Sequence, residues 1–260
     1  MAIHYKNSEE IMAMREAGRI VARCHEALRE AVKPGISTWE LDQVALKVME
    51  SHGAVSAFIG YPYGSQNPFP AHITTCINDE LVHGIPNPQR ILTEGDIVSL
   101  DVGVIYKGFV GDAAFSMGVG KISKEAQRLL DITEAALYEG IRNATVGNYT
   151  SDVSKSIQHY VEKRGCSVVR EYTGHGVGRK MHEEPQVPNW WPMRKIRGWK
   201  AAALKPGMTF ALEPMVNAGR PETRVLDDEW TVVTEDGSLC AHFEHTIAIT
   251  EGEPLILTVL

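Results

Sequence analysis

Hydrophobic residues at the start of the chain follow a helical period. Apolar or small side chains recur on one face over residues 11–28, and Asn7 with Glu10 has the spacing of a capping box at a helix N-terminus. The breakers Lys33-Pro34-Gly35 end this helix. Thr38 is then expected to cap a second helix. The pattern therefore predicts two consecutive helices before the first strand.

A strand and a hairpin follow. Residues 97–106, with the sequence IVSLDVGVIY, have the β-branched composition of a strand, and Lys107-Gly108 suits a two-residue turn into the next strand. Pairing back from this turn sets Asp101 opposite Ala114. Asp101 and Asp112 then become diagonal neighbours on one face, about 7–8 Å apart at the backbone. The hairpin thus aims two carboxylates into one space, where they repel each other unless they share a proton or a cation.

The second half of the chain repeats the plan of the first at a constant offset of 112 residues. The same offset matches a helix cap, a helix end, a glycine and a strand of the first half with their counterparts in the second half. An internal duplication explains these matches better than chance similarity between common sequence patterns. The matching positions are Gly35 and Gly147, Thr38 and Thr150, Gly53 and Gly165, Gly95 and Gly207, and Asp101 and Glu213. We expect an internal pseudo-twofold duplication, with halves at about 8–118 and 123–250, that forms a single α+β domain over residues 1–260 around a curved, mostly antiparallel sheet.

Composition narrows the class of protein. Hydrophobic residues make up 43% and charged residues 23% of the 260, which is ordinary for a folded domain and excludes a disordered or coiled-coil chain. The formal net charge of −7 is unsuited to a dedicated nucleic-acid binder, so no DNA partner is expected. The four cysteines form no CxxC pair and no apolar stretch approaches about 18 residues, so we expect a cytoplasmic chain without a membrane partner.

Four acidic residues interrupt strands that otherwise have a buried pattern: Asp101, Asp112, Glu213 and Glu244. Acidic side chains are seldom buried unless they are paired or bind a cation. Each one alone could be a solvated or salt-bridged edge residue, but four converging carboxylates need about two divalent ions to balance their charge. A site rich in oxygen ligands suits manganese, iron or cobalt.

Three histidines stand in settings where a side chain can approach a ligand closely. His175 lies in the glycine-rich string TGHGVG, His182 follows seven positions later, and His83 lies in LVHGIP. Others are interpreted as ordinary surface or core residues: His4, His25, His52 and His159. The first three are therefore the candidates to join the carboxylates.

Together with these residues, the strings HGIP, GHGVG, MHEEPQVP, LKPGMTFALEPMVNAG and FEHTIAIT resemble the methionine aminopeptidases, in particular their type I, bacterial form. The similarity extends over about residues 5–258, and its motifs are highly specific. It implies the pita-bread fold of the creatinase and aminopeptidase group. It also implies five ligands for two divalent ions (cobalt, manganese, iron or zinc): Asp101, Asp112, His175, Glu213 and Glu244. Asp112 and Glu244 are expected to bridge both ions.

The resemblance further implies a hydrolase, a metalloaminopeptidase that removes the initiator methionine from nascent proteins and peptides when the second residue is small. Two cations close together lower the pKa of a water so that it can attack the first peptide bond. Glu213 is expected to move the proton towards the leaving amine, and His83 and His182 to contact the substrate at the scissile amide. The methionine pocket carried over from the family consists of Tyr61, Met181, Trp230, Phe58 and Thr74.

The chain departs from the family pattern in three places. The loop at 63–72 is longer than usual, Met181 stands where an aromatic residue is common, and residues 189–200 form an extension with three tryptophans and four basic residues. This extension is interpreted as a rim flap whose tryptophans pack on the protein, with contact to ribosomal RNA as the alternative. The expected partners are the N-termini of nascent polypeptides, with transient ribosome contact, and the chain is expected to be a monomer.

Other classes of protein fit less well. Prolidase and aminopeptidase P have related ligands but usually carry an N-terminal domain, for which the 100 residues before Asp101 leave no room. A non-enzymatic binding module or a metal-free, creatinase-like hydrolase on the same fold would lack some of the five ligands, and all five are present. A metalloaminopeptidase is therefore the preferred hypothesis.

Overall fold

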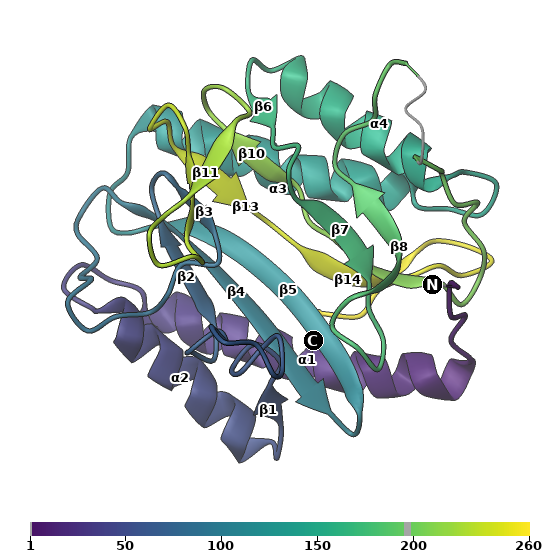
Figure 1. Cartoon of the computed structure of the whole chain (residues 1–260), viewed down its shortest axis with the longest axis horizontal. Helices are drawn as coiled ribbons and strands as arrows, with labels where there is room; N and C mark the ends of the chain where they lie inside the picture. Colours follow the sequence, from purple (N-terminus) through teal and green to yellow (C-terminus); the bar gives the residue numbers. More distant parts are fainter. Residues whose placement is uncertain (1, 195–198) are drawn as a thin grey trace.

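Four helices lie outside a group of curved sheets in the computed structural model, which describes residues 2–194 and 199–260 (Figure 1). The helices are α1 (Ser8–Ala31), α2 (Thr38–Ser51), α3 (Lys124–Asn143) and α4 (Thr150–Glu162). α1 packs on α2 and on the long strands of the first half, whereas α3 packs on α4 and on strands of the second half. Each helix pair thus covers the strands of its own half.

All strand pairing in the described chain is antiparallel, which confirms the expected α+β class with a mostly antiparallel sheet. The strands are β1 (Val55–Ser56), β2 (Thr74–Ile77), β3 (Glu80–Val82), β4 (Ile97–Tyr106), β5 (Phe109–Gly118), β6 (Ser167–Val168), β7 (Thr173–Gly176), β8 (Glu183–Pro188), β9 (Thr209–Leu212), β10 (Met215–Asn217), β11 (Thr223–Val225), β12 (Val232–Thr234), β13 (Cys240–His242), β14 (His245–Ala248) and β15 (Leu255–Ile256). One sheet has the order β1-β4-β2, with β5 also on β4, and the largest has the order β15-β14-β9-β7-β8. The two smaller sheets are β13-β10-β6 and β11-β12-β3.

The central hairpin forms in the predicted register. β4 pairs with β5 so that Asp101 lies opposite Ala114. The turn residues Lys107 and Gly108 have positive φ values of 49° and 78°, as a two-residue type I′ turn requires. Since side chains alternate along a strand, Asp112 points to the same face as Ala114 and therefore to the same face as Asp101.

The helix starts are close to the predicted ones. Asn7 caps α1 through the predicted capping box. The expectation that Thr38 caps α2 is wrong by one residue, because the cap is Ser37, whose backbone is extended and whose hydroxyl accepts the N–H of Glu40 at 3.2 Å. Thr38 is instead the first helical residue, and its hydroxyl donates to the carbonyl of Asn87 at 3.1 Å.

The two halves repeat each other in backbone detail. Equivalent hydrogen bonds occur at the predicted offset: Thr38 N to Arg90 O and Thr150 N to Ala202 O, and Leu92 N to Ile36 O and Leu204 N to Asn148 O. β1 pairs with β4 through residues equivalent to those through which β6 pairs with β10. Gly35 and Gly147 both have a positive φ, at 92° and 99°, that other residues seldom adopt. The duplicated α+β unit is therefore present in the structure.

The second half differs from the first at its carboxylates. β4 is one strand of ten residues, whereas its counterpart is divided into β9 and β10, with Glu213 between them. Glu244 likewise lies between β13 and β14, so the expectation that both glutamates sit inside strands is wrong. Pro214 has no N–H to continue a ladder. The N–H of Glu244 donates instead to the carbonyl of Ala114 in the other half, 2.8 Å away.

Buried hydrophobic side chains run through both halves. The largest cluster extends from Ile20 to Ile249 and includes residues of all four helices. The halves therefore share one core. Within the described part of the chain, no helix combines the length and the apolar character that crossing a membrane requires.

Candidate active site

A cavity of about 440 Å³ is lined by residues of both halves. Every residue that the sequence assigned to the site lies on its wall: Phe58, Tyr61, Thr74, His83, Asp101, Asp112, His175, Met181, His182, Glu213, Trp230 and Glu244. The tertiary structure thus brings the predicted carboxylates, histidines and apolar pocket residues together in one place.

The carboxylates in this cavity are too buried to carry their charges alone. Asp112 and Glu244 are each 2% exposed, and one oxygen of each lacks a hydrogen-bond partner among the described residues, as does Oδ1 of Asp101. Burial raises the pKa of all three carboxyls well above their ordinary range, and neighbouring carboxylates raise it further. Burial also raises the pKa of Glu213 to about 8. Unpaired carboxylate oxygens are a suitable donor set for divalent cations.

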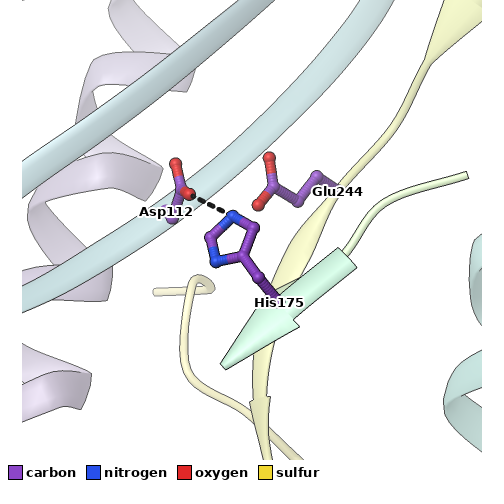
Figure 2. Close-up of side chains that lie close together, drawn as sticks. All are labelled: Asp112, His175 and Glu244. Atoms are coloured by element: carbon purple, nitrogen blue, oxygen red, sulfur yellow. Dashed lines mark ion pairs between the residues drawn. The ribbon is translucent and has the colours of Figure 1, made fainter. Parts of the chain in front are cut away.

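Three of the candidate ligands come from three separate elements (Figure 2). Asp112 is on β5, His175 on β7, and Glu244 between β13 and β14, and one potential ligand atom from each lies within 4.8 Å of the others. β7 reaches this position because glycine flanks His175 on both sides. A Cβ on Gly174 would lie 2.5 Å from a backbone oxygen of β9, and a Cβ on Gly176 would lie 2.3 Å from a backbone oxygen of β8. The glycine-rich motif therefore allows β7 to lie tightly between its neighbours.

His175 presents a nitrogen lone pair to the carboxylates. Its Nδ1 lies 3.1 Å from the carbonyl oxygen of Gly176, and because that oxygen can only accept, Nδ1 carries the proton. Nε2 is then unprotonated, 3.8 Å from Asp112 Oδ2 and 3.6 Å from Glu213 Oε1. Burial and the nearby His182 lower the pKa of His175 to about 3, so the ring is neutral at neutral pH. A lone pair that faces carboxylate oxygens is repelled unless a proton or a cation lies between them, and a cation in this place would meet both oxygen and nitrogen ligands, so these residues fit a metal site.

A tyrosine orients His182. The hydroxyl of Tyr61 lies 2.7 Å from His182 Nδ1. Burial lowers the pKa of His182 and raises that of Tyr61, so at neutral pH a protonated hydroxyl faces a neutral ring. When the hydroxyl donates to Nδ1, Nε2 of His182 carries the ring proton and can act as a donor. The His182 ring also lies beside that of His175, with centroids 4.2 Å apart.

His83 adopts a rare backbone conformation on the cavity wall. Its φ is 61°, which few residues other than glycine adopt outside strongly constrained or functional positions. Burial, with smaller contributions from His242 and His182, lowers the pKa of His83 to about 4. Its ring lies edge-on to that of Trp230, with centroids 6.2 Å apart. The backbone thus holds a neutral imidazole against the apolar part of the cavity.

The cavity wall includes two aromatic residues that the sequence did not indicate. Phe69 lies edge-on to Trp230 with ring centroids 5.2 Å apart, and Tyr172 lies edge-on to His83 at 5.8 Å. Both residues line the cavity. No sequence motif marks them, because each lies in an irregular segment whose position depends on packing.

A buried histidine beside the carboxylates also escaped sequence-based prediction. His242 is 2% exposed, and its Nε2 lies 3.6 Å from Glu213 Oε2 and 4.0 Å from Glu244 Oε2. The repeat contains the signal, since β10 pairs with β13 as β4 pairs with β5, and this places His242 at the position of Asp112. His242 follows Asp112 by 130 residues, whereas the other equivalent positions are 112 residues apart, because the second half has an insertion before β13. A search at the constant offset therefore misses this match.

A buried ion pair ties the N-terminal segment to the turn that carries His182. Lys6 Nζ lies 2.6 Å from Glu183 Oε2, and the lysine side chain is 1% exposed. The second oxygen of Glu183 accepts the backbone N–H of Lys180 at 3.1 Å. The pair therefore fixes the backbone directly next to His182.

Lys6→Met is expected to destabilise the fold by about 3 kcal/mol, because it leaves a largely buried carboxylate without its cation. Urea unfolding at neutral pH measures the loss as a lower midpoint at an unchanged slope. The matched control is Lys107→Met, which breaks an exposed pair with Glu16 and is expected to cost less than about 1 kcal/mol. Equal losses in the two variants would contradict a special contribution from the buried pair.

Chelator-treated protein is expected to lose stability as the pH rises from about 7 to 8, a range above the ordinary pKa of histidine, in which the buried histidines no longer contribute to the pH dependence. The pKa of Glu213 is about 8 in the folded state against 4.5 ordinarily, so the folded state binds more protons than the unfolded chain in this range. Unfolding therefore releases protons in this range, and a higher pH shifts the equilibrium towards the unfolded chain. Melting temperatures across this range should fall for the chelated protein, less so for Glu213→Gln, and not for protein saturated with Mn²⁺. A rising melting temperature in the chelated protein would contradict the assignment.

Part of the predicted flap lies outside the described residues, namely 195–198. In the described part, the ring of Trp199 lies 5.0 Å from that of Trp190 and 5.4 Å from that of Trp191, centroid to centroid. Trp190 Nε1 donates to the carbonyl of Arg170 at 3.3 Å. The three tryptophans thus pack on one another and on the protein.

The fold and the site together define a class of protein. The sequence model of metallopeptidase family M24 matches residues 12–251. The chain therefore belongs to metallopeptidase family M24, a family of metal-dependent hydrolases.

High-identity relatives narrow the class to the methionine aminopeptidases. A Bacillus subtilis (strain 168) protein named methionine aminopeptidase 1 is 51% identical, over 97% of this chain and 98% of the relative. The methionine aminopeptidase of Aquifex aeolicus is 48% identical over the whole of both chains. The crystal structure of methionine aminopeptidase from Thermotoga maritima superposes with a TM-score of 0.92 at 40% identity, covering both chains fully. The resemblance to the bacterial type of this enzyme is confirmed.

More distant structures share the fold alone. The Xaa-Pro dipeptidase from Bacillus anthracis superposes with a TM-score of 0.76 at 22% identity, and the match covers 98% of this chain but 61% of that one. This likeness, with those above, confirms the predicted pita-bread fold.

Proposed function

We propose that this protein removes the N-terminal methionine from nascent proteins and peptides whose second residue is small. The observation that carries the proposal is a single cavity with buried carboxylates and imidazoles on one part of its wall and aromatic side chains on another. The carboxylates and imidazoles suit metal-dependent hydrolysis, and the aromatic side chains suit the flexible thioether side chain of methionine. The high-identity relatives, which are named methionine aminopeptidases, support the same substrate.

Two divalent cations are the cofactors that the donor set supports. The residues proposed to hold them are Asp101, Asp112, His175, Glu213 and Glu244. The resemblance to the methionine aminopeptidases is the reason that Asp112 and Glu244 are proposed to serve both ions, and their place in one cluster with His175 supports a shared ion there. When bound, such a pair polarises the scissile carbonyl and lowers the pKa of a water, so that hydrolysis proceeds near neutral pH. Cobalt, manganese, iron and zinc all accept this mixture of oxygen and nitrogen ligands.

His182 is proposed to donate a hydrogen bond from Nε2 to the carbonyl oxygen of the scissile bond. Tyr61 supports this role, because its hydroxyl occupies Nδ1 and leaves the ring proton on Nε2. A donor of this kind stabilises the negative charge that develops on the oxygen in the transition state. His83 is proposed to contact the amide of the same bond.

Glu213 is proposed to carry the proton. Burial raises its pKa to about 8 when no cation is bound, so its carboxylate is a stronger base than that of an exposed glutamate. It accepts the proton of the attacking water and delivers it to the nitrogen of the departing amine. The same side chain is thus proposed as a ligand and as an acid–base group.

The methionine side chain is proposed to lie in the apolar part of the cavity. The residues proposed to contact it are Phe58, Tyr61, Thr74, Met181 and Trp230. Phe69 supports this wall, since its ring packs edge-on to both Phe58 and Trp230. Met181 adds a flexible side chain that can adapt to a flexible substrate.

Residues 1–260 are proposed to form a single catalytic domain that acts as a monomer in the cytoplasm. The core shared by both halves supports the single domain. The four buried, free cysteines of the described chain fit a reducing compartment. Transient ribosome contact is proposed for the flap, because Lys200 lies with Trp191 and Trp199 in a hollow that borders β8, a strand that also lines the main cavity.

Turnover of the peptide Met-Ala-Ser, compared with an Ala-Pro dipeptide, tests the proposed function. Chelated protein is expected to be inactive, and adding Mn²⁺, Co²⁺ or Fe²⁺ is expected to restore methionine release. The kcat/KM for Ala-Pro is expected to be at least about 100-fold lower, since its first side chain leaves the apolar pocket unfilled. Preferential cleavage of Ala-Pro would favour a prolidase-like activity instead, and no turnover with any of these cations would overturn the proposal.

A further inference from the structure

We infer that His242 is a positioning residue for Glu213: its Nε2, 3.6 Å from Glu213 Oε2, is placed to donate to the carboxylate that is proposed as both ligand and proton carrier. This inference rests on the proposed metal-dependent function and adds to it a residue that acts through Glu213. It is drawn from the geometry around that carboxylate, from the cavity wall and from the internal repeat.

The Glu213 carboxylate lies between two imidazoles. Its Oε1 is 3.6 Å from His175 Nε2, and its Oε2 is 3.6 Å from His242 Nε2. His175 offers a lone pair on its side, because its Nδ1 carries the proton. On the other side, a carboxylate that binds a cation is ionised and its oxygen can only accept, so the favourable arrangement has the proton on His242 Nε2. The two rings therefore make different contributions to one carboxylate.

His242 lies behind the carboxylates and not on the cavity wall. Glu213 and Glu244 line the cavity, whereas the side chain of His242 is 3% exposed and is absent from the described wall. Its Nε2 has no hydrogen-bond partner within reach among the described residues, and carboxylate oxygens of the two glutamates lie 3.6 and 4.0 Å from it. Because His242 is not on the cavity wall, it does not contact the substrate, and any effect on the reaction passes through Glu213 or Glu244.

The repeat assigns His242 to a position that bears a candidate ligand in the other half. β4 and β5 place Asp112 opposite Gly103, and β10 and β13 place His242 opposite Met215 in the equivalent register. The second half thus has a neutral donor where the first half has a carboxylate. One more carboxylate would add negative charge to a cluster that already holds four, whereas an N–H stabilises the charge present.

The backbone of His242 is clamped across the two halves. The hydroxyl of Ser116 on β5 accepts the N–H of His242 at 2.9 Å and donates to its carbonyl at 2.8 Å. A second hydroxyl, that of Ser99, lies 2.7 Å from Ser116 Oγ. The clamp fixes the residue relative to the first-half carboxylates, as a positioning role requires.

His242→Gln and His242→Met test the inference, because the two replacements have similar shapes and differ in whether they can donate a hydrogen bond. Mn²⁺ titration of the chelated protein is expected to show one of two binding events weakened about 10–100-fold in His242→Met and restored to within about threefold of wild type in His242→Gln. The visible absorption spectrum of the Co²⁺-loaded protein is expected to change in the first variant and to resemble wild type in the second. His242→Leu is a second variant without a donor, for use if the methionine variant does not fold.

The control is His25→Leu, which removes another buried imidazole from the α1 side of the sheet, where its Nε2 lies 3.0 Å from Ala113 O. Both Mn²⁺ affinities are expected to stay unchanged in it. Wild-type affinities in His242→Met would overturn the inference. So would a His242→Gln variant as weak as His242→Met, since the ring would then be a ligand. Wild-type protein that binds no Mn²⁺ would instead overturn the proposed function, which separates the two failures.

Discussion

Asp112→Asn and Glu244→Gln are each expected to abolish most peptidase activity and to weaken the binding of at least one divalent cation. Both side chains are 2% exposed, and both lie in the ligand cluster with His175. An amide keeps the shape of the carboxylate but removes its charge and one of its acceptor oxygens. Since each carboxylate is proposed to serve both cations, the loss of affinity should exceed the roughly 10–100-fold cost of removing a group that only supports a ligand.

Calorimetric titration of chelated protein with Mn²⁺ measures this effect. Wild type is expected to bind two ions, and each variant to lose at least one of them within the accessible concentration range. The kcat/KM for Met-Ala-Ser should fall by at least about 10³, the upper end of the range for losing one transition-state donor. Asp131→Asn and Glu125→Gln, which make the same chemical changes at exposed positions of α3, serve as matched controls. Two intact sites in either active-site variant would contradict the bridging roles.

His182→Ala is expected to lower kcat by about 10²–10³ while two cations remain bound. The reason is that His182 is proposed as a donor to the substrate carbonyl and not as a ligand. Its Nδ1 is occupied by the hydroxyl of Tyr61 at 2.7 Å, so only Nε2 is available for the substrate. Single-turnover measurements on Met-Ala-Ser, with metal content determined on the same samples, test both parts of the expectation.

Tyr61→Phe separates the donor from its support. It keeps the aromatic wall but removes the hydroxyl that fixes the His182 tautomer, and a hydrogen bond of this kind is worth about 1 kcal/mol, or roughly fivefold in rate. The variant should therefore retain most of the activity that His182→Ala loses. Loss of a bound cation in His182→Ala would make His182 a ligand and remove the need for a donor.

The first two helices and the register of the central hairpin were predictable because neighbours in sequence determine them. A two-residue turn leaves one pairing for the flanking strands, and a slip by one residue would move every side chain to the other face. The hairpin turn alone therefore places Asp101 and Asp112 on one face. The cap of α1 followed from two residues three positions apart.

The errors arose where distant contacts outweigh local preference. Thr38 has a good side chain for a cap, but its hydroxyl is used by the carbonyl of Asn87 and the cap moves to Ser37. Glu244 lies in a sequence typical of a continuous strand, but its N–H donates to Ala114 in the other half and divides the strand there.

The sequence by itself determined the repeat, the hairpin and, through its motifs, the family and the residues of the candidate site. Only the tertiary structure decided how those residues act on one another. The proton on His175 Nδ1 depends on a backbone carbonyl, the hydrogen bond at His182 Nδ1 depends on a tyrosine over a hundred positions away, and the place of His242 behind Glu213 depends on pairing between β10 and β13. These properties depend on burial and on orientation between segments far apart in the chain, and neither can be obtained from spacing along the sequence.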